Sequence, residues 1–311
     1  MADTIVFIVG PTASGKTKLS VAVAQHFNGE IVSADSMQVY RGLDIGTAKI
    51  SDSAADPISH HMISVVDPRK EYSVYDFRVH ALACIKAIHA RGNMPFVVGG
   101  SGLYIKALLD GLAPQPGQDR AVRARLQGLA SEQGTALLHT RLSELDPHTA
   151  AGINPQDERR IIRALEICEL SQKTPSEWKQ ETVSLMDLGY QPIVIGIDRD
   201  RSTLYERVHE RVDEMLAQGL LDEVRALKDV QLSRTTKQAV GYKELFDFLD
   251  GQCAFEDAVA TIKKNTRHLV KKQLTWFRKE KRIEWFPVEQ YACEQDMVVD
   301  LIKYISEHSN I

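Results

Sequence analysis

The strongest constraint on this chain is a phosphate-binding pattern near its start. The sequence Gly-Pro-Thr-Ala-Ser-Gly-Lys-Thr at residues 10–17 fits the spacing G-x-x-x-x-G-K-[ST]. The β-rich apolar run Thr4–Gly10 precedes it, and Lys16–Phe27 follows with apolar residues at helical spacing. A loop between a strand and a helix is the context in which this pattern binds phosphate. We therefore expect these residues to bind a diphosphate or polyphosphate: Gly10, Pro11, Thr12, Ala13, Ser14, Gly15, Lys16 and Thr17.

The chemistry of this loop follows from its residue types. Glycines let the backbone wrap around an anion, and the amides of the loop and of the helix N-terminus stabilise negative oxygens. Lys16 adds a positive charge, and the hydroxyl of Thr17 can ligate Mg²⁺. The pattern does not identify the ligand as ATP.

Further short apolar runs predict the rest of a sheet. Glu30–Ala34, Met94–Gly99 and Pro192–Ile197 are expected strands, and Val74–Ala90 is an expected helix. Non-alternating apolar strands between helices are typical of a parallel sheet covered on both faces. We expect an α/β fold with a P-loop NTPase-like parallel sheet flanked by helices.

A break in composition after Leu112 predicts a second domain. The segment Ala113–Gly117 is rich in proline and glycine, and the chain from there to about Gly189 has helical patterns only. We predict a helical insertion domain at 113–190 within a core domain formed by 1–112 and 191–311. After Asp198 the chain is mostly helical, with one short strand at Ile283–Val288.

Composition excludes several other classes of protein. The 311 residues are 43% hydrophobic and 26% charged, which are values of ordinary globular proteins. The four cysteines form no C-x-x-C pair, so the sequence predicts neither a zinc ribbon nor a disulfide framework. The N-terminus is acidic and its apolar run is short, so we expect no secretion signal, no membrane span and a cytoplasmic location.

The distribution of charge is uneven along the chain. Lys263–Arg282 contains nine lysines and arginines and one acid, a net charge of +8, whereas the whole chain carries −4. Apolar residues at helical spacing indicate that one face of this segment is packed: Ile262, Leu269, Val270, Leu274 and Phe277. Such a basic stripe on an acidic protein favours contact with a nucleic-acid backbone. Trp276 either stacks on a nucleotide or anchors the helix.

Polar side chains follow two of the predicted strands. Asp35 ends Glu30–Ala34 and is a Mg²⁺ ligand, a general base or a helix N-cap. Gln38 either reads the edge of a base or is a solvated amide. Ser101, within the Gly99–Gly102 turn, binds a phosphate or a substrate amine, or caps the next helix.

Arginines supply further candidates. Arg207 and Arg211 are four residues apart on a predicted helix, so they either clamp phosphate oxygens or are solvated surface charges. Arg159, Arg160 and Arg163 cluster in the predicted insertion, with Arg123 near its start. The adjacent pair His60-His61 has no third ligand at matching spacing, so we interpret these histidines as structural.

Together these residues resemble the bacterial tRNA dimethylallyltransferases, also called tRNA isopentenyltransferases. The resemblance covers nearly the whole chain. It rests on the loop 10–17, on the block Ser33–Lys49 and on Val97–Tyr104, and it is extended by Asn154–Leu165, Val240–Glu244 and Gln273–Phe277.

The resemblance implies a reaction and its partners. Such enzymes transfer a dimethylallyl group from dimethylallyl diphosphate to N6 of the adenosine on the 3′ side of the anticodon, tRNA position 37. Pyrophosphate leaves, and Mg²⁺ assists as cofactor. The implied partners are the anticodon stem-loop of a tRNA and the prenyl donor, with no membrane contact, and the enzyme is expected to act as a monomer.

The resemblance also implies roles for individual residues. Asp35 corresponds to the base that engages N6, Ser101 to a second catalytic hydroxyl that is threonine in many relatives, and Arg211 to a diphosphate-binding arginine. Besides Asp35 and Ser101, the positions that match tRNA contacts are Ser36, Met37, Gln38, Arg123, Arg159, Arg160, Ile161, Ile162, Arg163, Val240, Gly241, Tyr242, Lys243, Glu244, Leu245, Gln273, Leu274, Thr275, Trp276, Phe277, Arg278, Lys279 and Glu280.

Two other functions share parts of this pattern. A small-molecule or nucleotide kinase would have the same phosphate loop, sheet and Mg²⁺, with the insertion as its lid. A non-catalytic P-loop module that binds RNA would have the basic segment but would yield no product. The block Ser33–Lys49 and the basic segment disfavour the kinase, and the set Asp35, Ser101 and Arg211 disfavours the binding module.

Overall fold

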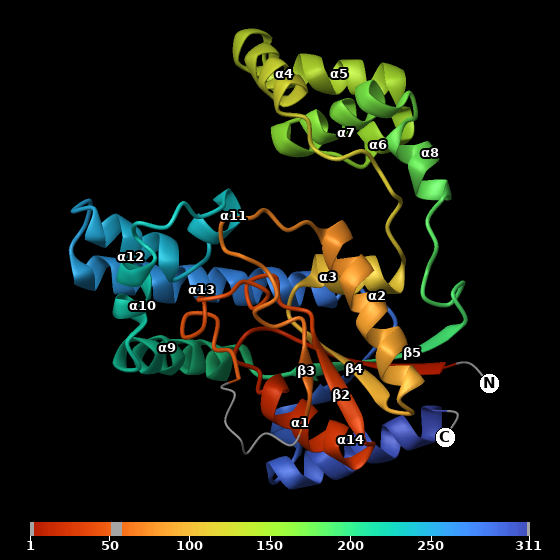
Figure 1. The fold of residues 1–311 in the computed structure, drawn as a ribbon, viewed down its shortest axis with the longest axis vertical. Coiled ribbons are helices and arrows are strands. Elements are labelled where there is room, and N and C mark those ends of the chain that lie inside the picture. The colour runs from red at the N-terminus through yellow and green to blue at the C-terminus, as the bar shows by residue number, and fades with distance from the viewer. Residues whose placement is uncertain (1–2, 51–57, 310–311) are drawn as a thin grey trace. The chain divides into compact units, whose positions relative to one another are not determined.

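The computed structural model describes residues 3–50 and 58–309, and within them six strands form one parallel sheet (Figure 1). The spatial order is β3-β2-β4-β1-β5-β6, and each neighbouring pair is parallel. The strands are β1 (Asp3–Val9), β2 (Gly29–Ser33), β3 (His60–His61), β4 (Met94–Gly99), β5 (Tyr190–Asp198) and β6 (Ile283–Pro287). The α/β fold with a parallel sheet flanked by helices is thus confirmed.

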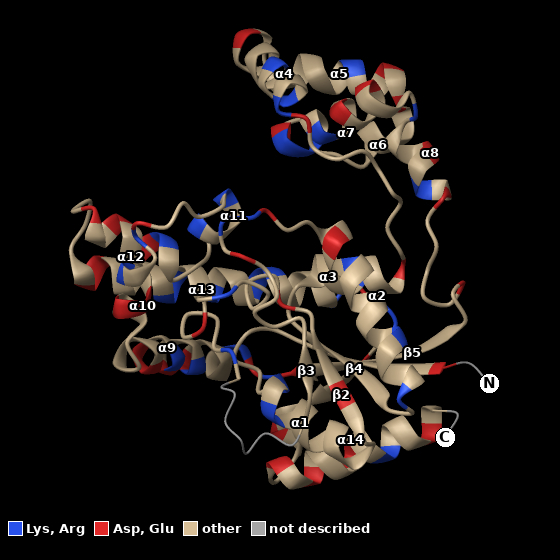
Figure 2. Ribbon diagram, viewed as in Figure 1, with Lys and Arg blue, Asp and Glu red and all other residues tan. Residues whose placement is uncertain are grey.

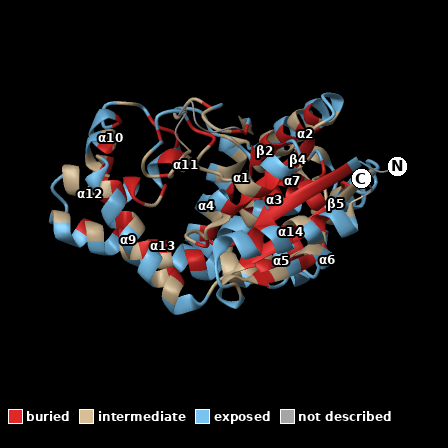
Figure 3. Cartoon of the chain, turned by 90° about the horizontal axis from the view of Figure 1, so that it is seen from below, coloured by how far each residue is buried: buried red, intermediate tan, exposed pale blue. Residues whose placement is uncertain are grey.

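Helices cover both faces of this sheet because alternate residues of each strand face opposite sides. Ile5, Phe7 and Val9 of β1 pack in one core with α2 and α3, whereas Val6 and Ile8 pack in a second core with α1 and α14. The strands β1, β2 and β4 are therefore almost entirely buried, and Figure 3 shows buried residues in red.

The chain divides into two compact units, one formed by Met1–Leu109 with Leu185–Ile311 and one formed by Asp110–Ser184. The domain limits proposed from composition were 113 and 190. In the structure Leu185 is buried in the core with α2, and Tyr190 begins β5. Helices of the first unit are α1 (Lys16–His26), α2 (Val74–Ala90), α3 (Gly102–Leu109), α9 (Arg201–Ala217), α10 (Leu220–Ala226), α11 (Arg234–Lys237), α12 (Tyr242–Leu249), α13 (Phe255–Phe277) and α14 (Glu294–His308).

The second unit is helical in its described elements, as the sequence predicted. Its helices are α4 (Arg120–Gln133), α5 (Thr135–Leu145), α6 (Pro147–Ala151), α7 (Glu158–Ser171) and α8 (Pro175–Gln180). They enclose a core of their own that includes Leu126, Leu142 and Leu165. Over the residues that the structure describes in either unit, no helix has the length and apolar character needed to cross a membrane.

A third core in the first unit holds the long loop that follows β2. Tyr40 and Leu43 of this loop are fully buried against α9, α10, α12 and α13. The loop is therefore an integral part of the fold, although it contains no regular secondary structure in its described part before β3.

One buried carboxylate links β2 to the edge strand β3. Glu30 of β2 accepts hydrogen bonds from both Nε and Nη2 of Arg91 (2.9 and 2.7 Å), and it also contacts His61 of β3 (2.6 Å) and Asn93 (2.7 Å). The hydrogen bonds from Arg91 are the main reason that the pKa of Glu30 is lowered to about 2. His61 therefore has a structural partner.

We expect Glu30→Ala to lower the free energy of unfolding by about 2 kcal/mol at pH 7, because it removes the shared acceptor of Arg91, Asn93 and His61. A group with a depressed folded-state pKa stabilises the fold above its unfolded pKa, near 4.5, and loses this effect as the pH falls toward 2. In urea unfolding, the difference in the free energy of unfolding between Glu30→Ala and wild type should be smaller at pH 3 than at pH 7. Glu284→Ala, an exposed site on β6, is the control, and an equal loss in both variants would contradict the assignment.

Candidate active site

The phosphate loop lies between β1 and α1, where the sequence predicted it. Gly15 has a φ of 95° and directly precedes the helix, and Ala13 also adopts a left-handed conformation with a φ of 69°. A side chain at Gly10 would place its Cβ 2.7 Å from the carbonyl oxygen of Ile197, so the close approach of β5 requires glycine there.

Lys16 sits at the start of α1 with its ammonium turned back toward the loop. Its Nζ donates a hydrogen bond to the carbonyl of Pro11 (2.6 Å). The pKa of Lys16 is lowered to about 7, chiefly by burial and also by the neighbouring charge of Arg211, whereas the charge of Asp35 opposes both effects. Because the cations Lys16 and Arg211 share one small region, an anion with several negative oxygens matches it electrostatically.

Asp35 directly follows β2 and closes a turn. Its Oδ1 accepts hydrogen bonds from the backbone amides of Met37 (2.8 Å) and Gln38 (3.3 Å). No helix begins here, so Asp35 is not a helix N-cap. Its carboxylate caps a turn instead. Within the described residues, Oδ2 receives no hydrogen bond and is available to a substrate.

Ser101 joins the ends of β2 and β4. Its Oγ accepts a hydrogen bond from the amide of Ser36 (2.9 Å), and its own amide donates to the carbonyl of Ala34 (3.2 Å). Its backbone carbonyl accepts the first hydrogen bonds of α3, from the amides of Tyr104 and Ile105. The hydroxyl of Ser101 is bonded to Ser36 instead, so the structure does not show it as a side-chain cap of α3.

The glycines around Ser101 are explained by close packing. A Cβ at Gly99 would lie 2.3 Å from the carbonyl oxygen of Ala34, and one at Gly102 would lie 2.3 Å from the ring of Trp276. A Cβ at Gly100 would lie 2.4 Å from the side chain of Gln273. Gly100 and Gly102 allow α13 to pack directly onto the turn after β4, and Gly99 allows this turn to approach Ala34 at the end of β2.

Gln273 of α13 connects two parts of the site. Its Oε1 accepts a hydrogen bond from the amide of Thr12 in the phosphate loop (2.8 Å), and its Nε2 donates to the carbonyl of Gly100 (3.0 Å). The resemblance suggested only a tRNA contact at this position. The structure adds that Gln273 fixes the phosphate loop relative to the turn that carries Ser101.

Two cavities meet at these residues. The larger, of about 550 Å³, has a mainly apolar wall that includes Leu103, Met215 and Trp276. The smaller, of about 230 Å³, lies along the phosphate loop and is lined by Lys16 and Thr17. Four residues line both cavities: Thr12, Asp35, Gly100 and Arg211. The arrangement offers an anion site beside an apolar chamber, with a carboxylate at their junction.

The two arginines of α9 differ in their surroundings. Nε of Arg207 donates to the carbonyl of Ala13 (2.9 Å), so this residue supports the phosphate loop. Arg211 is largely buried, which lowers its pKa, while the charge of Asp35 opposes that shift. Arg211 thus faces the junction of the cavities, and the interpretation of this pair as solvated surface charge does not hold for it.

Of the remaining candidates after β2, Ser36 and Met37 line the larger cavity. Gln38 lines the smaller cavity and is oriented by bonds within the chain, because its Oε1 accepts from Ser33 (2.9 Å) and its Nε2 donates to the carbonyl of Thr47 (3.1 Å). Its position beside the cavity therefore depends on bonds within the chain.

The candidates on α12, on α13 and around them separate by exposure. Val240, Gly241, Tyr242, Gln273 and Trp276 line the larger cavity, Glu244, Leu245 and Phe277 are buried, and Leu274 is half-buried. Lys243, Thr275, Arg278 and Lys279 are exposed, and Glu280 pairs with Arg282. Leu245 and Phe277 pack in hydrophobic cores, whereas Glu244 accepts hydrogen bonds from the amide of Gly241 (2.8 Å) and from Asn265 (2.7 Å).

The charge pattern of α13 agrees with the amphipathic helix that the sequence predicted (Figure 2). Ile262, Val270 and Phe277 are buried, whereas Lys271 and Lys272 are exposed. One member of the expected packed face differs: Leu269 is 36% exposed and lines the larger cavity. It differs because α13 lies beside an open chamber at that point.

The arginine candidates of the second unit divide in the same way. Arg159 and Arg160 are exposed at the start of α7, and Ile161 and Ile162 are buried in the core of that unit. Arg123 and Arg163 both pair with Glu166, whose side chain is fully buried. Glu166 receives a two-point hydrogen bond from Arg123 (2.9 Å each) and one from Arg163 (2.7 Å).

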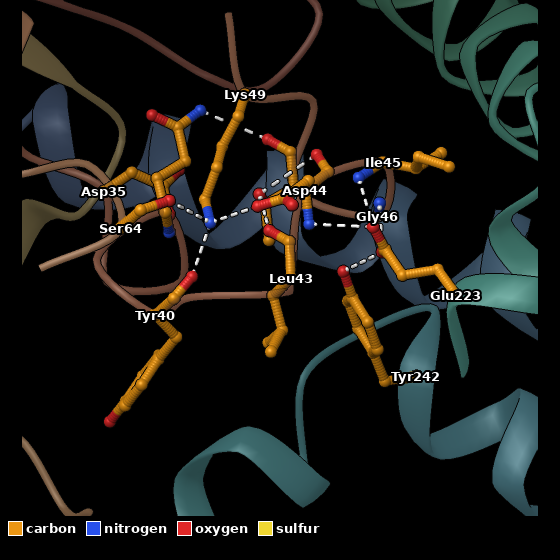
Figure 4. Close-up of polar contacts among 12 residues, drawn as sticks. Asp35, Tyr40, Leu43, Asp44, Ile45, Gly46, Lys49, Ser64, Glu223 and Tyr242 are labelled. Carbon is orange, nitrogen blue, oxygen red and sulfur yellow. Dashed lines mark hydrogen bonds and ion pairs between the residues drawn. The ribbon is translucent and has the colours of Figure 1, made fainter. Parts of the chain in front are cut away.

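Sequence reasoning missed two residues that fix the loop after β2, Lys49 and Glu223 (Figure 4). Lys49 lies within the block Ser33–Lys49, and a lone lysine in a loop of polar and small residues was the only signal. Glu223 lies in the first turn of α10, where an acid is ordinary, so nothing in the sequence marks it. Both side chains contact backbone groups of Tyr40–Gly46.

Known protein families and individual relatives match most of this chain. The family model for IPP transferase matches residues 38–280, and the model for isopentenyl transferase matches residues 3–58. A tRNA dimethylallyltransferase of Geobacillus thermodenitrificans is 44% identical over 311 residues, covering 98% of this chain and 97% of the relative. One from Geobacter sulfurreducens is 45% identical and covers 90% of this chain and 91% of the relative.

Solved structures are similar over the same extent. The tRNA isopentenylpyrophosphate transferase of Bacillus halodurans matches with a TM-score of 0.73 and 40% identity, covering 99% of this chain and 97% of that one. A eukaryotic dimethylallyltransferase acting on tRNA matches with a TM-score of 0.81 and 26% identity, covering 99% of this chain and 81% of that one.

The lowered pKa of Lys16 predicts that an anion binds together with a proton. At pH 8 a group with a pKa near 7 is mostly neutral, and a diphosphate beside it restores the charged form. At pH 8, we expect the binding of inorganic pyrophosphate to be accompanied by the uptake of nearly one more proton in the wild type than in Lys16→Met. Titration calorimetry in two buffers of different ionisation enthalpy measures this number. At pH 6 the difference should nearly vanish, and equal uptake at pH 8 would refute the role of Lys16.

Proposed function

This chain belongs to the IPP transferase family, and on that premise we propose that it is a tRNA dimethylallyltransferase. The reaction would transfer the dimethylallyl group of dimethylallyl diphosphate to N6 of the adenosine next to the anticodon on its 3′ side, position 37, and release pyrophosphate. The observation that carries the proposal is the meeting of an anion-binding cavity and an apolar cavity at Asp35 and Arg211.

The prenyl donor matches the two cavities in kind. Its diphosphate would occupy the loop 10–17 with Lys16 and Arg211, and its five-carbon chain would lie toward the apolar wall. As the bond between carbon and oxygen breaks, negative charge grows on the diphosphate and positive charge on the allylic carbon. Fixed positive groups at the loop stabilise the leaving diphosphate because they need no rearrangement during the reaction.

Asp35 would act on the acceptor. The amine at N6 of adenine is a poor nucleophile because its lone pair is delocalised into the ring. The free Oδ2 of Asp35 can accept a hydrogen from N6 as the new bond between nitrogen and carbon forms. Oδ1 is held by two backbone amides, which fixes the orientation of the carboxylate. Ser101 would contribute through its hydroxyl, which already bonds the neighbouring amide of Ser36.

The residues present suit magnesium as a cofactor. Thr17 and Asp35 line the same cavity as Lys16. Mg²⁺ commonly takes one or two protein oxygens and completes its shell with phosphate oxygens and water. Over residues 3–50 and 58–309, no cluster of three or more acidic, histidine or cysteine side chains forms a metal site without substrate. A bound Mg²⁺ would therefore share the charge of the diphosphate and be held chiefly by it.

The proposed acceptor is an RNA whose adenine has left its stack, since the carboxylate lies in a chamber too narrow for a duplex. Exposed basic residues on α13 and the exposed Arg159 and Arg160 would contact the phosphates of the anticodon stem-loop. We also propose that the enzyme acts as a monomer in the cytoplasm. The relatives and the mainly apolar chamber support this function over a kinase.

The decisive experiment is nucleoside analysis of unmodified tRNA treated with the protein, Mg²⁺ and dimethylallyl diphosphate. We expect a new adenosine heavier by one five-carbon group, together with released pyrophosphate. A parallel incubation with labelled ATP and candidate acceptors should transfer no phosphate. A labelled phosphorylated product without a prenylated adenosine would favour the kinase instead, and tRNA binding with no product would favour the binding module.

Asp35→Asn should lower kcat by about 10²–10⁴ because the variant amide accepts a hydrogen less well and cannot take the proton. Its oxygen can still hold the turn at Met37 and Gln38, so the affinity for tRNA should change less than threefold. Filter binding with tRNA measures affinity, and single-turnover assays measure the chemical step. A variant that turns over at a near-native rate would exclude Asp35 as the base.

A further inference from the structure

One wall of the larger cavity is formed by residues of the loop after β2, and the carboxylate of Glu223 holds this loop in place. Gly46 and Thr47 of the loop after β2 line the cavity beside Met37 and Tyr242. The loop has no regular secondary structure at these positions. What keeps it in place therefore decides whether the cavity has a fixed shape.

Glu223 of α10 binds the backbone of this loop at three consecutive amides. Its Oε2 accepts hydrogen bonds from the amides of Asp44 (2.9 Å) and Ile45 (2.8 Å), and its Oε1 accepts from the amide of Gly46 (3.2 Å). Successive amides that converge in this way form an anion-binding nest, which Glu223 fills from within the chain (Figure 4).

Tyr242 completes the same cluster. Its hydroxyl donates to Oε1 of Glu223 (2.6 Å), and its ring is almost fully buried. Burial, followed by the hydrogen bond to Glu223, raises the pKa of Tyr242, so the hydroxyl remains a donor. A Cβ at Gly46 would lie 2.6 Å from the Tyr242 ring, so the loop passes directly over the aromatic face.

A second residue holds the other end of the loop. The side chain of Lys49 is 5% exposed, and its Nζ donates to the carboxylate of Asp44 (2.6 Å), to Oγ of Ser64 (2.9 Å) and to the carbonyl of Tyr40. Between these ends, Ala48 adopts a left-handed φ of 45°, which is unfavourable for a residue with a Cβ. Such a conformation persists when its surroundings fix it.

From this geometry we propose that Glu223 is a positioning residue for the RNA acceptor. It holds residues 44–47 as a preformed wall of the chamber that receives the nucleobase, and Tyr242 transmits this support to the cavity. Ordering a free loop costs conformational entropy at every residue that becomes fixed. A loop fixed before RNA binds avoids that cost on binding, which makes the effect specific to the acceptor. This inference rests on the proposed function.

The nest also predicts what an uncharged replacement can do. In Glu223→Gln, one oxygen can still accept from the amides of Asp44 and Ile45. The NH₂ group then takes the place of Oε1 and faces the N–H of Gly46, and two donors cannot form a hydrogen bond. The hydroxyl of Tyr242, in contrast, can accept a hydrogen bond from this NH₂ group instead of donating one. The substitution should therefore free Gly46 while α10 and the rest of the core stay in place.

The test compares Glu223→Gln, Tyr242→Phe and their combination with the neighbouring Asp222→Asn. Asp222 lies on the same helical turn but its side chain is 77% exposed and pairs only at the surface with Arg225. We expect Glu223→Gln to raise KM for tRNA about tenfold, with kcat and KM for the donor within twofold of wild type. Tyr242→Phe should act in the same direction and more weakly, and the double variant should resemble Glu223→Gln because both remove the same contact.

Amide hydrogen exchange of the free protein provides a readout independent of activity. Exchange in residues 43–48 should accelerate in Glu223→Gln and Tyr242→Phe but not in Asp222→Asn. Faster exchange with an unchanged KM for tRNA would overturn the proposal, and so would an equal rise in KM for tRNA and for the donor. If Glu223→Gln does not fold, Tyr242→Phe alone decides between these outcomes. Failure of wild-type protein to prenylate tRNA would refute the proposed function instead.

Discussion

The parallel pairing of β4 between β1 and β2 is the constraint on which the site depends. Because parallel strands present their carboxyl ends at one edge, the segments after these three strands must converge there. The phosphate loop follows β1, Asp35 follows β2 and Ser101 follows β4. The hydrogen bonds that join Ala34, Ser36 and Ser101 then fix the distance between two of these segments. Backbone pairing thus brings chemistry from three distant parts of the chain to one edge of the sheet.

Helix α13 forms one side of the site at this edge of the sheet. Phe277 at its end is buried in the same core as β1 and α2, and Gln273 bonds both the phosphate loop and the turn after β4. The opposite side of the same helix carries the exposed Lys271 and Lys272. One rigid element therefore links the surface proposed for RNA to the loop proposed for the donor. A shift of this helix would disturb both at once, which makes it the natural route of coupling between the two substrates.

Local patterns in the sequence predicted the sheet and the position of Asp35, Ser101 and the phosphate loop. They succeeded because strand periodicity and glycine-rich turns depend on neighbouring residues. They could not predict the bond between Thr12 and Gln273, which joins residues 261 positions apart. Nor could they place Glu223 under the loop after β2, or assign Arg123 and Arg163 to the buried Glu166. In each case a charged or amide side chain gains its role from a long-range contact, and its immediate sequence context is that of an ordinary surface residue.

The electrostatics of the junction explain why this arrangement suits a donor that carries a diphosphate. Lys16 and Arg211 lie near one carboxylate, Asp35, and burial opposes the charge on both cations. A diphosphate supplies the additional negative charge and relieves their mutual repulsion, so the donor stabilises its own binding site. The same anion would compete with Asp35 for the two cations. With the donor bound, Asp35 would therefore share the positive charge of Lys16 and Arg211 with a second anion.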